Sequence, residues 1–136
     1  MKALIDTCII VDFLQKREPF FKSSHLIFLA VANYDFEGYI TAKSVADIYY
    51  IMHHFFHDNN KTRAALEKIF KLFGVLDTTE LDCKKALLSD LSDYEDALMV
   101  ETAIRNKLDG IVTRNTDDYL KSPIKIFSPD EFLKIL

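Results

Sequence analysis

Acidic side chains follow short apolar runs at several points in this sequence, and the first of them is Asp6. It stands between Ala3-Leu4-Ile5 and Ile9-Ile10-Val11, so its carboxylate should be half-buried. Carboxylates that lie close together repel, and one or more becomes protonated unless a cation neutralises the charge. Mg²⁺ and Mn²⁺ suit such a site, because these hard ions take carboxylate oxygens, water and substrate phosphate as ligands. If further acids lie beside Asp6, the sequence indicates a divalent-metal site.

Three glycines indicate the elements that would position these acids. Gly38, Gly74 and Gly110 each follow a helix-like stretch and precede a short apolar run, which predicts a helix ended by a C-cap glycine and then a strand. Strands are expected at 2–5, 39–40, 75–76, 111–112 and 125–127, and helices at about 9–15, 19–34, 43–57, 61–72, 80–90 and 94–107. A short last helix should begin after Ser128, with Pro129 as its first residue. This alternation predicts an α/β fold, a three-layer α/β/α sandwich around a parallel sheet of about five short strands.

In an open α/β sheet a ligand binds outside the carboxyl ends of the strands. Asp6 ends the first expected strand, and Asp47 falls in the first turn of the helix after the second. The helix before Gly110 must run antiparallel to the strand that follows, so its N-terminal turn returns to the same edge. That turn carries Asp93, Glu95 and Asp96, and the loop after the fourth strand carries Asn115, Asp117 and Asp118.

Helix capping is an equally good explanation for some of these acids. Asp and Glu are favoured in the first turn of any helix, because they complement its dipole and accept from its free N–H groups. Asp47, Asp93 and Glu95 could each be present for that reason alone. Asp6 is harder to explain in this way, because apolar residues flank it on both sides.

Length and composition indicate one domain. The chain has 136 residues, of which 49% are apolar and 28% charged, so a single unit over 1–136 can bury its own core. No apolar run approaches the roughly 20 residues that cross a membrane. The N-terminal stretch carries Lys2 and Asp6, unlike a signal peptide, and Cys8 and Cys83 have no CxxC companion. We expect a cytoplasmic protein with free thiols and no membrane contact.

Net charge and glycine spacing bear on which ligands this protein can bind. The charge of −4 by itself argues against a nucleic-acid partner, because Lys and Arg supply most of the affinity for phosphates. Acids are concentrated between Asp77 and Asp118, however, which fits either a metal site or a solvated surface. The glycines are too far apart for GxGxxG or GxxxxGKS, and GxSxG is absent. A phosphate must therefore be held by other means.

Three short motifs resemble the PIN domain family, and in particular its VapC-like toxin branch. They are Leu4-Ile5-Asp6-Thr7, Asp93-Tyr94-Glu95-Asp96-Ala97-Leu98, and Val112-Thr113-Arg114-Asn115 with Asp118-Tyr119. The resemblance spans nearly the whole chain, and three motifs in order are more specific than any one alone. It implies an α/β/α sandwich and a Mg²⁺- or Mn²⁺-dependent endoribonuclease, the toxin of a type II toxin–antitoxin pair. It also implies RNA as the substrate, an antitoxin protein as a partner, and a homodimer.

The resemblance also assigns roles to residues. Asp6 matches the first family acid and Asp96 the third, while Asp47 stands where the family usually has the longer Glu. The region of the fourth acid is matched by Asn115 and Asp118, with Asp117 as a nearby substitute. The expected catalytic residues are Asp6, Asp47, Asp96 and Asp118, and the expected metal ligands are Asp6, Asp96, Asp47 and Asp117.

Other polar residues are expected to support this set. The hydroxyls of Thr7, Ser44 and Thr113 could orient a carboxylate or a phosphate, and Asp93 and Asn115 belong to the same group. Arg114 and Lys43 are candidate phosphate contacts, whereas ordinary surface charge is the better interpretation of Lys16-Arg17.

Two other functional classes fit the same residues. One is a catalytically weak PIN fold that binds RNA or protein without cutting, which Asp47 in place of Glu and the acidic charge favour. The other is an unrelated α/β phosphotransfer or phosphatase domain with Asp6 as its nucleophile. Cys8 stands where the DxDx-type phosphatases have a second Asp, which argues against that class.

Overall fold

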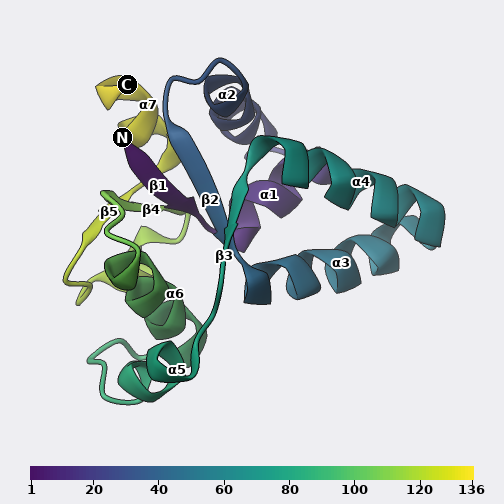
Figure 1. Ribbon diagram of the computed structural model, residues 1–136. Coiled ribbons are helices and arrows are strands. Elements are labelled where there is room, and N and C mark those ends of the chain that lie inside the picture. The colour runs from purple at the N-terminus through teal and green to yellow at the C-terminus, as the bar shows by residue number, and fades with distance from the viewer.

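The computed structural model describes residues 1–136 and contains a five-stranded sheet with strand order β3-β2-β1-β4-β5 (Figure 1). The strands are β1 (Lys2–Ile5), β2 (Glu37–Thr41), β3 (Gly74–Leu76), β4 (Gly110–Val112) and β5 (Lys125–Phe127). Every neighbouring pair is parallel. The predicted parallel sheet is therefore confirmed, and β1, which leads into Asp6, is its central strand.

Helices join the strands as expected, with one addition. They are α1 (Thr7–Leu14), α2 (Phe21–Ala32), α3 (Ala42–Phe56), α4 (Asn59–Leu72), α5 (Glu80–Ala86), α6 (Tyr94–Arg105) and α7 (Pro129–Ile135). A 3₁₀ helix, η1 (Thr116–Tyr119), lies between β4 and β5 and was not predicted. The α3 and α4 helices pack against each other and project from the sheet, with the start of α3 at its edge (Figure 1).

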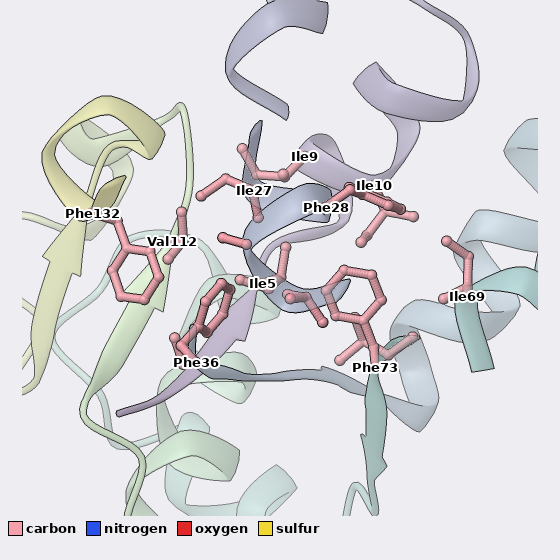
Figure 2. Close-up of a cluster of buried hydrophobic side chains, with 14 of the residues drawn as sticks. Ile5, Ile9, Ile10, Ile27, Phe28, Phe36, Ile69, Phe73, Val112 and Phe132 are labelled. Carbon is pink, nitrogen blue, oxygen red and sulfur yellow. The ribbon is translucent and has the colours of Figure 1, made fainter. Parts of the chain in front are cut away.

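The two faces of the sheet carry separate cores. On β1, Ala3 and Ile5 belong to the larger cluster, which packs α1, α2, α3, α4 and α7 against one face (Figure 2). Leu4 points the other way, into a smaller cluster with Met99, Val100 and Ala103 of α6. This alternation follows from the period of two residues in a strand. Helices thus cover both faces, and the α/β/α sandwich expected from the sequence is confirmed.

The interpretation of the glycines as helix C-caps was wrong. Gly38 lies within β2, Gly74 and Gly110 are the first residues of β3 and β4, and no glycine has a positive φ. Glycine is required at these positions because atoms of neighbouring residues lie where a Cβ would be. A Cβ on Gly74 would lie 2.7 Å from the ring of Tyr39, and a Cβ on Gly110 would lie 2.7 Å from the carbonyl oxygen of Lys125. These contacts across neighbouring strands, rather than a turn, require glycine.

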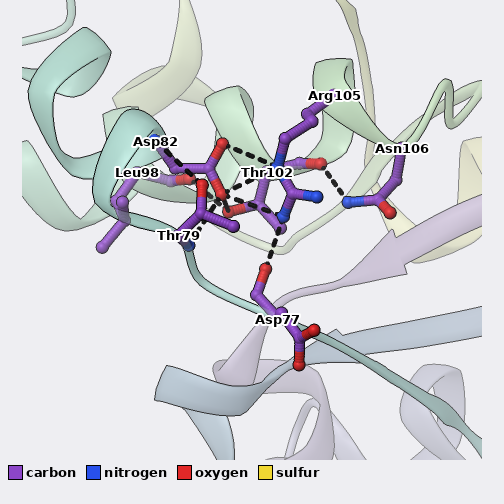
Figure 3. A network of polar contacts seen from close by, with 7 residues as sticks. All are labelled: Asp77, Thr79, Asp82, Leu98, Thr102, Arg105 and Asn106. Carbon is purple, nitrogen blue, oxygen red and sulfur yellow. Dashed lines mark hydrogen bonds and ion pairs between the residues drawn. The ribbon is translucent and has the colours of Figure 1, made fainter.

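An ion pair between the buried Asp82 and the partly exposed Arg105 holds α5 against α6 (Figure 3). Arg105 at the end of α6 donates from Nε and Nη2 to Asp82, at 3.0 Å each, and from Nη2 to the carbonyl oxygen of Asp77 at 2.6 Å. Thr79 and Asp82 also form a capping box at the start of α5. Burial works to raise the pKa of Asp82, but the hydrogen bonds from Arg105 and Thr79 outweigh it and lower that pKa. The network holds the segment after β3 against the helix whose first turn carries the acidic motif.

Two smaller findings bear on the sequence predictions. Cys8 and Cys83 are both free thiols. None of the helices combines the length and the apolar character needed to cross a membrane.

Candidate active site

Four of the predicted acids meet beyond the carboxyl ends of β1, β2 and β3. A pocket of about 310 Å³ opens there, and acids from three segments line it together with one lysine. The charged lining residues are Asp6, Lys43, Asp47, Glu95 and Asp96. The start of α1, the first turns of α3 and the start of α6 therefore contribute to one concave surface.

Asp6 is held in place from two directions. Its backbone N–H donates to the carbonyl oxygen of Val112 at 3.0 Å, which continues the pairing of β1 with β4. Its Oδ2 accepts from the hydroxyl of Thr113 at 2.7 Å. Asp6 is the N-cap residue of α1, yet its side chain makes no capping hydrogen bond. Burial raises the pKa of Asp6 despite the Thr113 hydrogen bond, so this carboxylate is costly to ionise without a nearby cation.

Asp96 lies in the first turn of α6 and is crowded by other acids. Its N–H donates at 3.0 Å to Oδ1 of Asp93, which is the N-cap of the helix. Burial raises the pKa of Asp96 to about 6, and the negative charges of Asp93, Asp6 and Asp118 add to this increase while Tyr119 opposes it. Capping thus accounts for Asp93, whereas the shift of Asp96 is typical of carboxylates brought together at a functional site.

The raised pKa of Asp96 predicts that the metal-free protein gains stability as the pH falls. The ordinary pKa of an Asp is 3.8, so the folded state takes up the proton first, beginning near pH 6. In EDTA, the free energy of unfolding should rise between pH 7.5 and pH 5, with Asp6 adding in the same direction. Urea unfolding of the wild type and Asp96→Asn at both pH values measures this. A rise of equal size in Asp96→Asn would assign the effect to other groups.

Asp47 is paired with a base and does not cap its helix. It lies in the second turn of α3, not in the first as expected, because α3 already begins at Ala42. Lys43 Nζ lies 2.6 Å from Asp47 Oδ2 and 3.0 Å from Glu95 Oε1, which links α3 to α6. Burial works to lower the pKa of Lys43, but its hydrogen bonds to Asp47 and Glu95 outweigh this and raise it. Lys43 therefore stays charged.

Hydroxyl groups connect the starts of α1 and α3. Thr41, the N-cap of α3, accepts from the backbone N–H of Ser44 at 3.0 Å. The hydroxyls of Thr41 and Thr7 donate to Ser44 Oγ at 2.9 and 3.1 Å. All three residues line the pocket. Thr7 and Ser44 thus lie where a supporting hydroxyl was predicted.

The loop after β4 lies at the margin of the site. Asn115, Asp117 and Asp118 are exposed, and none of them lines the pocket. Asp118 is close enough for its negative charge to raise the pKa of Asp96. Arg114 turns towards α1, where its Nε donates to Asp12 at 2.7 Å and its guanidinium lies 4.2 Å from the ring centre of Phe20.

Some residues of this region were not predicted. Thr78 and Thr102 line the pocket, and the Thr78 hydroxyl is buried without a hydrogen-bond partner. Nothing in their sequence context distinguishes them from other threonines. Asp12 is fully buried in α1 and holds Arg114. A single acid within the apolar run from Ile9 to Leu14 was a signal that could have revealed it.

The donor set fits a hard divalent ion that brings its own water. No three His, Cys, Asp or Glu side chains converge tightly enough to hold a metal ion by themselves. Mg²⁺ does not need such a cage, because it is usually bound by one or two carboxylates, with water and substrate phosphates as the other ligands. Asp6 and Asp96 provide two carboxylates whose charges interact, and both carry raised pKa values that a cation would relieve.

Solved structures show that this fold recurs in other proteins. A toxin–antitoxin complex from Klebsiella pneumoniae contains a chain 21% identical to this one, with a TM-score of 0.68 over 93% of this chain and 97% of that chain. VapBC2 from Rickettsia felis, bound to a DNA fragment from its promoter, gives 16% identity and a TM-score of 0.69 over 94% and 98%. FitAB bound to the IR36 DNA fragment gives 17% identity and a TM-score of 0.71 over 93% and 94%. No curated protein matches the sequence significantly.

The fold and the pocket define an α/β/α protein with clustered carboxylates at the carboxyl edge of a parallel sheet. The family profile of the PIN domain matches residues 2–117. The chain belongs to the PIN domain family, and the resemblance seen in its three motifs is confirmed.

Proposed function

We propose that this protein, folded as a single domain over 1–136, is a divalent-metal-dependent endoribonuclease and the toxin of a type II toxin–antitoxin pair in the cytoplasm. The observation that carries the proposal is the crowding around Asp96, whose pKa is raised to about 6 by burial and by the charges of Asp93, Asp6 and Asp118. Membership of the PIN family supports nuclease activity. The solved complexes of similar chains support an antitoxin as partner, and a homodimer is part of the same proposal.

In this proposal Asp6 and Asp96 hold the metal, and Asp47 with Asp118 or Asp117 completes the site through water. When bound, Mg²⁺ or Mn²⁺ lowers the pKa of a bound water and stabilises negative charge on the phosphate oxygens. The side chains of this protein orient the ligands. Thr113 fixes Asp6 through its hydrogen bond of 2.7 Å, and Asp93 fixes the first turn of α6 beneath Asp96.

The test is cleavage of a mixed RNA pool by the purified full chain with Mn²⁺, with Mg²⁺ and with EDTA. We expect cutting only with metal, and products with 5′-phosphate and 3′-hydroxyl ends, because a water and not the ribose 2′-hydroxyl attacks the phosphate. Cutting in EDTA, or products ending in a 2′,3′-cyclic phosphate, would contradict the proposal.

A catalytically weak RNA- or protein-binding module is the second candidate. The observation that favours it is the ion pair of Lys43 with Asp47. Asp47 stands where the PIN family usually has Glu, and the ion pair engages its carboxylate. RNA that binds but stays intact with both metals would support this function. A third class, with Asp6 as a phosphorylated nucleophile, requires an aspartyl phosphate on Asp6 that mass spectrometry would detect.

A further inference from the structure

Lys43 is the only base among the residues that line the pocket, which also include four acids. Its Nζ lies between Asp47 and Glu95, at 2.6 and 3.0 Å. Arg114, the other expected phosphate contact, donates to the buried Asp12 and does not line the pocket. Any positive charge that this pocket presents to a substrate therefore comes from Lys43.

The ion pairs of Lys43 are weak enough for Lys43 to exchange one acidic partner for another negatively charged group. The side chain of Lys43 is 35% exposed, that of Asp47 is 38% exposed, and that of Glu95 is 70% exposed. Partly exposed pairs of this kind are weak and screened by solvent. A lysine also has a long flexible stem with a compact charge, so its ammonium group can change partners by rotation alone. By contrast, the Asp12–Arg114 pair is anchored by a carboxylate that is 1% exposed.

We propose that Lys43 is the built-in cation of this site. Without a divalent metal it neutralises Asp47 and Glu95, and when a metal is present it releases Asp47 and donates to a phosphate of the substrate. This inference rests on the proposed function, because it names which residue meets the phosphate. It also supplies the positive charge with which a pocket lined by four acids can bind a polyanion.

Two effects of opposite sign follow from removing the Lys43 charge. In Lys43→Met, Asp47 loses its competing partner and one repulsive charge disappears from the site. Mn²⁺ should therefore bind roughly tenfold more tightly, the size expected for one unit charge about 6 Å from a divalent ion at the dielectric constant of water. RNA should bind more weakly. The negative slope of log K against log salt should become less negative by about 0.7, the value for one missing phosphate contact to a single strand.

The experiment compares the wild type, Lys43→Met and Lys84→Met. Lys84 forms a similar pair four residues from Glu80, at 2.9 Å, but lies on α5 outside the pocket, so Lys84→Met is a matched loss of one paired lysine. Isothermal titration with Mn²⁺, without RNA, measures the metal affinity. Binding of a single-stranded RNA in Ca²⁺ at several salt concentrations measures the slope, with the RNA checked on a gel to be intact.

Tighter Mn²⁺ binding in Lys43→Met alone supports the proposal, and equal or weaker binding overturns it. An unchanged salt slope overturns the phosphate contact. If the wild type binds Mn²⁺ but neither binds nor cuts RNA, the proposed nuclease function is overturned. The titration then still decides whether Lys43 competes with the metal for Asp47. If neither the wild type nor Lys43→Met binds Mn²⁺, both proposals are overturned.

Discussion

Asp6→Asn should lower metal-dependent RNA cleavage by at least about 100-fold, because substitutions that only support a metal ligand already cost 10–100-fold. The amide keeps the shape of the side chain but removes the charge that would hold the metal. Asp6 makes no capping hydrogen bond in α1, so the substitution removes no helix cap. Initial rates on an end-labelled RNA with Mn²⁺, at equal protein concentration, measure the loss.

Two controls separate this loss from unfolding. Burial raises the pKa of Asp6, so a neutral Asn removes a buried charge and should leave the folded state at least as stable at pH 7.5. The Asn carbonyl can still accept the Thr113 hydroxyl. Asp90→Asn changes an exposed acid outside the pocket and should cut RNA like the wild type. Wild-type cutting by a well-folded Asp6→Asn would assign the activity to another site or to a contaminant.

The parts of this structure that follow from local patterns could be predicted from the sequence. Apolar runs and helical periodicity predicted all five strands and the helices between them. The rule that ligands lie at the carboxyl ends of parallel strands then brought Asp6 and Asp96 to one pocket. The first step uses information carried by neighbouring residues, and the second requires only that the strands are parallel, so both succeeded although the strand order was not predicted.

The parts that depend on long-range partners could not be predicted. Gly74 and Gly110 were misinterpreted because the residue that each one faces lies on another strand, as Tyr39 does for Gly74. The sequence shows that Lys43 and Asp47 are four residues apart, but not that Glu95 from α6 completes the cluster. Asp12 and Arg114 are separated by 102 positions, so no local pattern relates them. Pairing between distant segments thus decides which charges are free to act.

Arg114→Met should lower the free energy of unfolding by about 3–5 kcal/mol, the usual cost of leaving one partner of a buried ion pair alone. The side chain of Asp12 is 1% exposed, and its Oδ1 has no hydrogen-bond partner even in the intact protein. Arg17, whose Nη1 lies 4.0 Å from Asp12 Oδ1, makes no hydrogen bond to that oxygen. Urea unfolding at pH 7.5 measures the change.

The double variant Asp12→Asn with Arg114→Met separates charge from packing. Without the Asp12 charge, much of the lost stability should return. An equal loss in the single and double variants would instead assign the effect to the packing of Arg114 on Phe20.

The double variant also tests the phosphate contact that the sequence predicted for Arg114, since it lacks the guanidinium but should fold. Because Arg114 is committed to Asp12 and Lys43 is the base in the pocket, we expect the double variant to keep the wild-type salt slope for RNA binding. A slope that becomes less negative by about 0.7 would show that Arg114 contacts a phosphate.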